Sequence, residues 1–324
     1  MIWDPIKILN IFGFKLYIYS IFFFISFLLG IKKLKYFYKI DEQKIDYLIK
    51  YSLLGLLIGA RIGHVLFYDF FYFKTNLLEA IFPIKNYKYI GYQGLSSHGA
   101  AIGLLISTFF YNKKFLKKQF FWLCDRLCII IAFSGSLIRI GNFFNSEING
   151  KKSNFAFPFS IGFIQLYQDK ILKIKRYPSQ LYESISYIII YKILFFLYKN
   201  YKNYKNYKNY KNYKNYKNYK NYKNYKNYKN YKNYKNYKNY KNYKNYKNYK
   251  KNKFNGYIFS IFLICIWSIR FLLEFLKEPQ PNEMFFLFKL NTGQLLSIPF
   301  IIIGFLLFFK KKLNTIIYKF YYPF

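Results

Sequence analysis

Acidic residues, histidine and cysteine are scarce in this sequence, and each shortage narrows what the protein can be. The 324 residues include 13 Asp and Glu against 52 Lys and Arg, together with two His and three Cys. The cysteines all fall inside apolar blocks, and no further Cys or His near Cys124 and Cys128 completes a tetrahedral zinc set. We therefore expect buried free thiols, with no disulfide framework, no metal site and no cofactor.

The net charge of +39 does not indicate a nucleic-acid-binding protein. Nearly half of it comes from one low-complexity tract, in which 18 lysines recur at every third position from Lys199 to Lys250. Most other lysines lie beside apolar blocks, as the positive-inside rule expects of membrane proteins. Zinc-finger spacing, RRM-like motifs and base-reading basic helices are absent. We therefore expect no nucleic-acid partner.

Long apolar blocks are the main feature outside that tract. The mean hydropathy of −0.02 averages two unlike parts of the chain, because the tract offsets the apolar blocks. Several blocks approach the ~20 residues that cross a bilayer core as a helix. The blocks lie at 16–31, 51–69, 95–111, 120–140, 180–198, 256–276 and 294–309. They predict an all-α integral membrane protein with about seven transmembrane helices.

Lysine-rich loops predict the orientation. They follow the first, third and fifth blocks and also form the C-terminal tail, so seven spans place all four segments on one side. Positive loops are typically cytoplasmic. We therefore expect the N-terminus outside and the C-terminus in the cytoplasm.

The Asn-Tyr-Lys tract divides the chain into three parts. Its period of three matches neither a helix nor a strand, and a like charge at every third residue disfavours a compact core. We expect residues 1–198 to hold five transmembrane helices and a periplasmic loop. Residues 199–253 are expected to form a disordered cytoplasmic insertion, and residues 254–324 to hold two further helices and a basic tail.

Ionisable residues within or beside the apolar blocks are the candidates for chemistry. Such groups are costly in a membrane and usually functional. They are Arg61, His64, His98, Arg139, Arg270 and Glu274. The excess of Ile, Lys, Asn, Tyr and Phe indicates an AT-rich genome, which favours lysine over arginine. Arginine kept at these positions therefore indicates a need for bidentate anion binding, and phosphate is an obvious ligand.

Two motifs hold most of these candidates. His98 lies in GLSSHGAAIG, where small neighbours allow close approach of helices or lipid. Arg139 lies in RIGNFFNSEING with Asn142, Asn145 and Glu147, a dense set of side chains that can bind hydroxyl groups. The structural alternatives are a hydrogen-bonded core histidine and a polar helix cap. Arg270 and Glu274, four residues apart in RFLLEFLKEP, share a helix face and can also simply pair with each other.

RIGNFFNSEING resembles the defining motif of the prolipoprotein diacylglyceryl transferase family. GARIGHVLFY, GLSSHGAAIG, YPSQLYE, RFLLEFLKEP and TGQLLSIP resemble the family's other conserved blocks, in the same order along nearly the whole chain. Tyr177 departs from the pattern, because a His often precedes Pro-Ser-Gln in the family. The Asn-Tyr-Lys tract is foreign to it.

The resemblance implies a membrane enzyme of seven helices that moves the diacylglyceryl group of phosphatidylglycerol to the thiol of a lipobox cysteine, as the first step of bacterial lipoprotein maturation. Glycerol phosphate leaves. Partners would be membrane lipid and prolipoprotein signal peptides, at the bacterial inner membrane. By resemblance, the catalytic residues are His98, Arg139 and Arg270. Substrate-binding residues are Arg139, Asn142, Asn145, Glu147, Tyr19 and Glu274.

A transporter for an anionic or lipid substrate is the alternative. It would also bury arginine and histidine, and seven spans do not exclude it. Internal repeats would favour it. The sequence shows none beyond the triplets.

Overall fold

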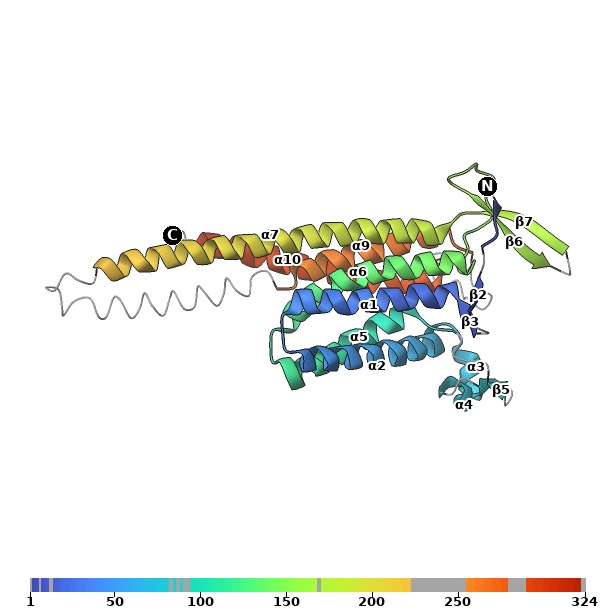
Figure 1. Ribbon diagram of the computed structural model, residues 1–324, viewed down its shortest axis with the longest axis horizontal. Helices are drawn as coiled ribbons and strands as arrows, with labels where there is room; N and C mark the ends of the chain where they lie inside the picture. The colour runs from blue at the N-terminus through green and yellow to red at the C-terminus, as the bar shows by residue number, and fades with distance from the viewer. Residues whose placement is uncertain are drawn as a thin grey trace.

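The computed structural model describes residues 2–5, 7–11, 14–81, 84–85, 88–89, 94–167, 170–222, 255–278 and 290–321. Figure 1 shows a bundle of long helices lying side by side, with the N-terminal strands and a β-hairpin at one end. The connection between α1 and α2 lies at the opposite end, together with a π-helical turn after α5 and the far end of α10.

Among the described residues, seven long helices form this bundle, one for each predicted apolar block. They are α1 (Ile18–Tyr38), α2 (Glu42–Phe67), α5 (Ser97–Tyr111), α6 (Phe120–Phe144), α7 (Ser179–Tyr222), α9 (Tyr257–Glu274) and α10 (Thr292–Tyr321). Within the described part of the chain, α2, α6, α7, α9 and α10 are long and apolar enough to cross a membrane. The helical membrane fold is therefore confirmed, whereas seven spans and the sides of the two termini stay predictions.

Short strands and helices at one end of the bundle were not predicted. β1 (Ile2–Trp3) pairs in parallel with β6 (Ile161–Tyr167), and β6 pairs antiparallel with β7 (Lys170–Arg176). Two smaller hairpins join β2 (Ile8–Ile11) to β3 (Phe14–Tyr17) and β4 (Ile84–Lys85) to β5 (Lys88–Tyr89). The helices α3 (Phe70–Thr75) and α4 (Leu77–Ile81) follow α2. These elements cap the bundle without changing its helical class.

Helix α7 continues into the Asn-Tyr-Lys tract as far as Tyr222. This differs from the disorder expected from residue 199 onward. Extending a nucleated helix costs far less than starting one, and the tract contains neither proline nor glycine to stop it. The rest of the tract, 223–253, lies outside the described residues, so its disorder stays a prediction.

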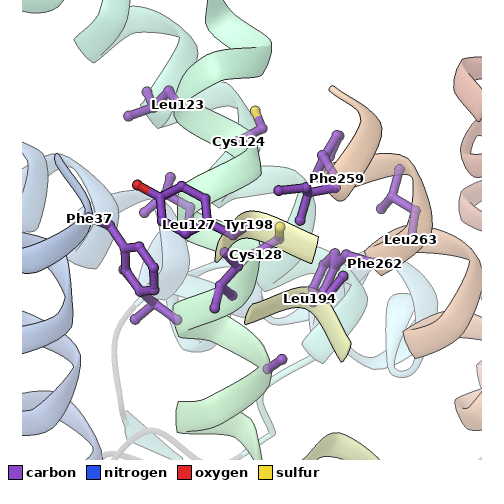
Figure 2. Packing of buried hydrophobic residues seen from close by; sticks show 14 of the residues in the cluster. Phe37, Leu123, Cys124, Leu127, Cys128, Leu194, Tyr198, Phe259, Phe262 and Leu263 are labelled. Atoms are coloured by element: carbon purple, nitrogen blue, oxygen red, sulfur yellow. The ribbon is translucent and has the colours of Figure 1, made fainter. Parts of the chain in front are cut away.

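The apolar core lies toward the end of the bundle where α1 and α2 connect. Figure 2 shows Phe37 of α1, Leu127 and Cys128 of α6, and Leu194 of α7 packed together, with Phe259 and Phe262 of α9 beside them. Cys124 and Cys128 are buried in this core, and all three cysteines are free. Core packing at one end leaves the polar side chains to gather at the other.

Glycines bring α2 and α5 into backbone contact. We call Gly55, Gly59, Gly63, Gly99 and Gly103 the glycine seam. A Cβ atom built on Gly59 would lie 2.4 Å from the carbonyl oxygen of Gly99, and one on Gly103 would lie 2.1 Å from that of Gly55. Only glycine permits this approach, which is typical of membrane helix pairs. The seam fixes the start of α5, where His98 precedes Gly99.

Candidate active site

The end of α6 carries the first group of predicted site residues. Arg139 Nη1 lies 3.4 Å from Asn142 Oδ1, and Asn142 Nδ2 lies 3.3 Å from Glu147 Oε2. Asn145 Nδ2 also donates to Glu147, at Oε1. Ser146 and Ile148 adopt φ of 55° and 56°, so the backbone turns back after the helix and directs Glu147 toward both amides. Four predicted residues thus form one hydrogen-bonded group.

Glu183 joins this group to two other helices. Its carboxylate pairs with Arg139 Nε and lies 2.8 Å from Lys277 Nζ, which lies 2.8 Å from Glu274 Oε2 as well. The Glu183 side chain is only 1% exposed, so both of its partners are held in a largely dehydrated setting. The ion pairs connect α6, α7 and the end of α9 at one point. Glu183 and Lys277 were not among the predicted site residues, although a carboxylate inside an apolar block was the signal that could have identified Glu183.

Arg270 lies one helical turn before Glu274 on α9. It interacts electrostatically with Glu183 and Glu274, and it bonds to the Tyr187 hydroxyl. Its Nε is buried and has no hydrogen-bond partner among the residues that the structure describes. A buried guanidinium with an unused donor is suited to an anionic ligand.

His98, the second residue of α5, is fully buried and contacts α9 and α10. Its Nε2 lies 3.3 Å from Ser297 Oγ, and that hydroxyl donates to the Gly293 carbonyl at 2.7 Å. Because the Ser297 proton is used, Ser297 accepts, and Nε2 carries the imidazole proton. In this neutral tautomer Nδ1 has the free lone pair, and it is buried without a partner in the described part of the chain.

Trp267 connects His98 with Arg270. The His98 and Trp267 rings stack with centroids 4.7 Å apart, and the Arg270 guanidinium carbon lies 5.9 Å from the centre of the same indole. The first turn of α10 also contacts Glu274, since a Cβ on Gly293 would lie 3.0 Å from the Glu274 carboxylate. His98 is therefore linked through Ser297 and Gly293 to the ion-pair group.

Tyr19 lies in the first turn of α1 and faces the end of α6. Its ring would lie 3.2 Å from a Cβ placed on Gly141, and its hydroxyl interacts electrostatically with Glu147 and Arg139. All eight predicted site residues therefore lie in one region, at the end of the bundle that holds the β-hairpin.

Arg61 and His64 have structural contacts of their own. Arg61 donates through Nε to the Ala80 carbonyl at 2.9 Å, and His64 Nε2 lies 3.0 Å from Asp69 Oδ2. These bonds tie α2 to the α3 and α4 segment that follows it.

Comparison with known proteins identifies the family. The family model described as prolipoprotein diacylglyceryl transferase matches residues 6–214 and 242–310. The chain belongs to this family. The match includes every motif on which the resemblance was based, so the family and its transferase class, both predicted from those motifs, are confirmed.

Similar proteins cover the chain almost end to end. A phosphatidylglycerol–prolipoprotein diacylglyceryl transferase of Bacteroides fragilis is 32% identical over 96% of this chain and 95% of that protein. One of Chloroherpeton thalassium is 30% identical over 90% of this chain and 87% of its own length. One of Campylobacter curvus is 27% identical over 97% and 96%. The chain thus matches whole members of the prolipoprotein diacylglyceryl transferase family.

Proposed function

We propose that this chain transfers the diacylglyceryl group of phosphatidylglycerol to a prolipoprotein cysteine, the first step of lipoprotein maturation. Family membership and the printed names of the similar proteins support this reaction. The structural observation that best supports this reaction is a cluster of polar side chains from six helices, which lies at one end of the membrane bundle. A transporter has no specific observation in its favour.

The reaction forms one bond and breaks one. The cysteine sulfur attacks the glycerol carbon that bears the phosphate, a carbon–sulfur bond forms, and the carbon–oxygen bond to phosphate breaks. The bridging oxygen takes the electron pair and leaves as glycerol phosphate, and the thiol proton passes to a base. The protein must therefore accept a proton and stabilise a departing phosphate.

Arg139 and Arg270 are the proposed phosphate ligands. Together with Lys277 they contribute three positive charges, which face the carboxylates of Glu183, Glu274 and Glu147. Guanidinium donors held in a low-dielectric site are suited to stabilising the charge that develops on a leaving phosphate. The unused Arg270 Nε supplies a donor without breaking any existing bond.

His98 is the proposed base. Its Nδ1 is the unprotonated nitrogen in the tautomer set by Ser297, so it can accept the thiol proton at once. Stacking on Trp267 and the bond to Ser297 hold the ring in place. The proton received would sit near the cations Arg270 and Lys277, so it is expected to be lost readily after transfer.

Asn142, Asn145, Glu147 and Tyr19 are the proposed contacts to the glycerol hydroxyls of the lipid headgroup, because amides, carboxylates and phenols bond to hydroxyls. Glu274 is proposed to act from the side of α9, where it also positions Lys277. The acceptor is proposed to be the lipobox cysteine of a signal peptide.

The location is proposed to be the bacterial inner membrane, with the site toward the outside. The lysine-rich connections after α1 and α5 lie at the end away from the site (Figure 1). The positive-inside rule then places that end in the cytoplasm.

The test is transfer in vitro. Purified protein is incubated with phosphatidylglycerol labelled in its acyl chains and a peptide with a lipobox cysteine, and a matched peptide carries serine in place of that cysteine. A thioether-linked product on the cysteine peptide alone is expected. Movement of labelled lipid across vesicles without any thioether product would instead support transport.

A further inference from the structure

A valley of about 950 Å³ runs between α2 and α5 on the outside of this helix pair. Its floor is the glycine seam, which lacks side chains and therefore leaves the hollow. Its walls are apolar side chains such as Leu54, Ile58 and Ile106, each more than half exposed. In a membrane, these walls face lipid, and an extended acyl chain has the shape and chemistry to fill the space between them.

Positive charge is confined to one end of the valley. Lys113 and Lys114, both exposed, are the charged residues among those that line it. They belong to the π-helical turn Asn112–Leu116 that follows α5. Asn112 Nδ2 donates to the Lys118 carbonyl at 2.7 Å, which closes this turn and fixes where the lysines emerge. Two cations at the end of an apolar valley complement a lipid with an anionic headgroup.

The charged end lies far from the candidate active site. His98 is at the start of α5 and the two lysines follow its last residue, so 15 residues of helix separate them. At 1.5 Å per residue this is about 22 Å. A lipid whose phosphate contacts Lys113 and Lys114 therefore cannot present that phosphate to Arg139 or Arg270.

We propose that the α2–α5 valley binds one anionic phospholipid that is not consumed, with its phosphate at Lys113 and Lys114 and an acyl chain along the glycine seam. Filling the valley adds contacts across α2 and α5. A ligand that binds only the folded protein stabilises it. Since α5 carries His98, the bound lipid also stabilises one wall of the active site.

Binding to the lysines is tested with phosphatidylserine, which is anionic but lacks the glycerol headgroup of the substrate. Native mass spectrometry of delipidated protein measures its affinity beside that of phosphatidylcholine. For K113Q/K114Q we expect roughly tenfold weaker phosphatidylserine binding, since each lysine near a lipid surface contributes appreciably. The control K117Q/K118Q removes the same charge from the same connection but not from the valley. Equal losses in the two variants would overturn the proposal, as would no loss in either.

Filling the valley gives a second, independent test. I106W places an indole between the walls and should displace the lipid, whereas I189W adds the same ring to a lipid-facing position of α7 that is 52% exposed. We expect I106W to lower the number of tightly held phosphatidylserine molecules by one, and I189W to leave it unchanged. Wild-type binding by a folded I106W protein would contradict the proposal.

Discussion

Arg139 contacts two partners through two nitrogens of its planar guanidinium: Nε pairs with Glu183, and Nη1 donates to Asn142. Lysine keeps the charge but has a single nitrogen, which cannot serve both partners in the same geometry. We expect R139K to lower transfer by about a hundredfold or more, the loss typical of a missing transition-state donor. The measurement is thioether product per unit of inserted protein.

The matched control is R126K, near the opposite end of the bundle. Arg126 also donates through two nitrogens, to the carbonyls of Phe37 and Trp122, but it lies away from the site. R126K should keep transfer within a few fold of wild type. Near-normal transfer by R139K would show that charge alone suffices and that the planar fork is not needed.

The proposed role of His98 as a base predicts how transfer depends on pH. H98A should lower transfer by roughly 10²–10⁴-fold at neutral pH, the usual contribution of a general base. A free cysteine thiol has a pKa of about 8.5, so raising the pH increases the thiolate fraction without help from the protein. Transfer by H98A should therefore recover partly as the pH rises.

S297A separates proton transfer from ring placement. It removes the partner of His98 Nε2 but leaves Nδ1, so we expect a smaller loss than for H98A and no steep recovery with pH. Absence of any recovery in H98A would assign His98 to orienting the substrate. Full activity of H98A would leave catalysis to the arginines.

A site residue could be predicted from the sequence when its partners lie close to it along the chain. Arg139, Asn142 and Glu147 fall within nine residues, so their grouping was readable from one motif. The ion pairs of Glu183 with Arg139 and Lys277 join positions 44 and 94 residues apart. Those charges come together only because α7 packs against α6 and α9. No local pattern in the sequence predicts that packing.

At the scale of elements, the glycine seam sets how closely α2 and α5 approach. A Cβ on Gly59 would also lie 2.7 Å from the Gly103 Cα, so G59A must push the two helices apart. We expect a loss of about 1–3 kcal/mol, the usual cost of overpacking, seen as a lower Tm in detergent. G30A is the control, because its Cβ would meet Ser134 Oγ at an ordinary 3.4 Å. Equal Tm values for the two variants would contradict the close approach.

Helices were predicted better than strands for a physical reason. A helix that crosses lipid must be long and apolar, and it must satisfy its own backbone, so it leaves a strong signal in the sequence. The β6–β7 hairpin has seven-residue strands outside the membrane bundle, where no such demand operates. Its pairing with β1 joins residues about 160 positions apart. The sequence of the long connection between residues 141 and 179 therefore did not predict it.

For the whole molecule, orientation is the first quantity to measure. If the lysine-rich end is cytoplasmic, a cysteine placed in the Asn-Tyr-Lys tract should resist a membrane-impermeant thiol reagent added to intact cells. A cysteine at Asn154, which is exposed near the β-hairpin, should react. Labelling of the tract alone would reverse the proposed orientation and place the active site on the cytoplasmic side.

The Asn-Tyr-Lys tract joins two points that other contacts already hold close together. Before it, the Tyr198 ring lies 5.5 Å from the Arg126 guanidinium carbon and 5.0 Å from the Phe37 ring. After it, the backbone N–H groups of Gly256 and Phe259 donate to the Asp125 carboxylate at 2.7 and 2.8 Å. Asp125 and Arg126 are neighbours in α6, so both ends of the tract are fixed to the same place.

Deleting residues 201–248 should therefore leave transfer intact. The six residues left before Asn255 reach at most about 20 Å when extended, and the two ends need less than that if both stay on α6. A shorter loop also costs less entropy to close. We expect the deleted protein to insert normally and to match wild-type transfer within a few fold. The control is D125N in the full-length chain, which weakens the link to α9 and should lower Tm. Lost transfer in a deletion protein that inserts and melts like wild type would show that the tract itself takes part in the reaction.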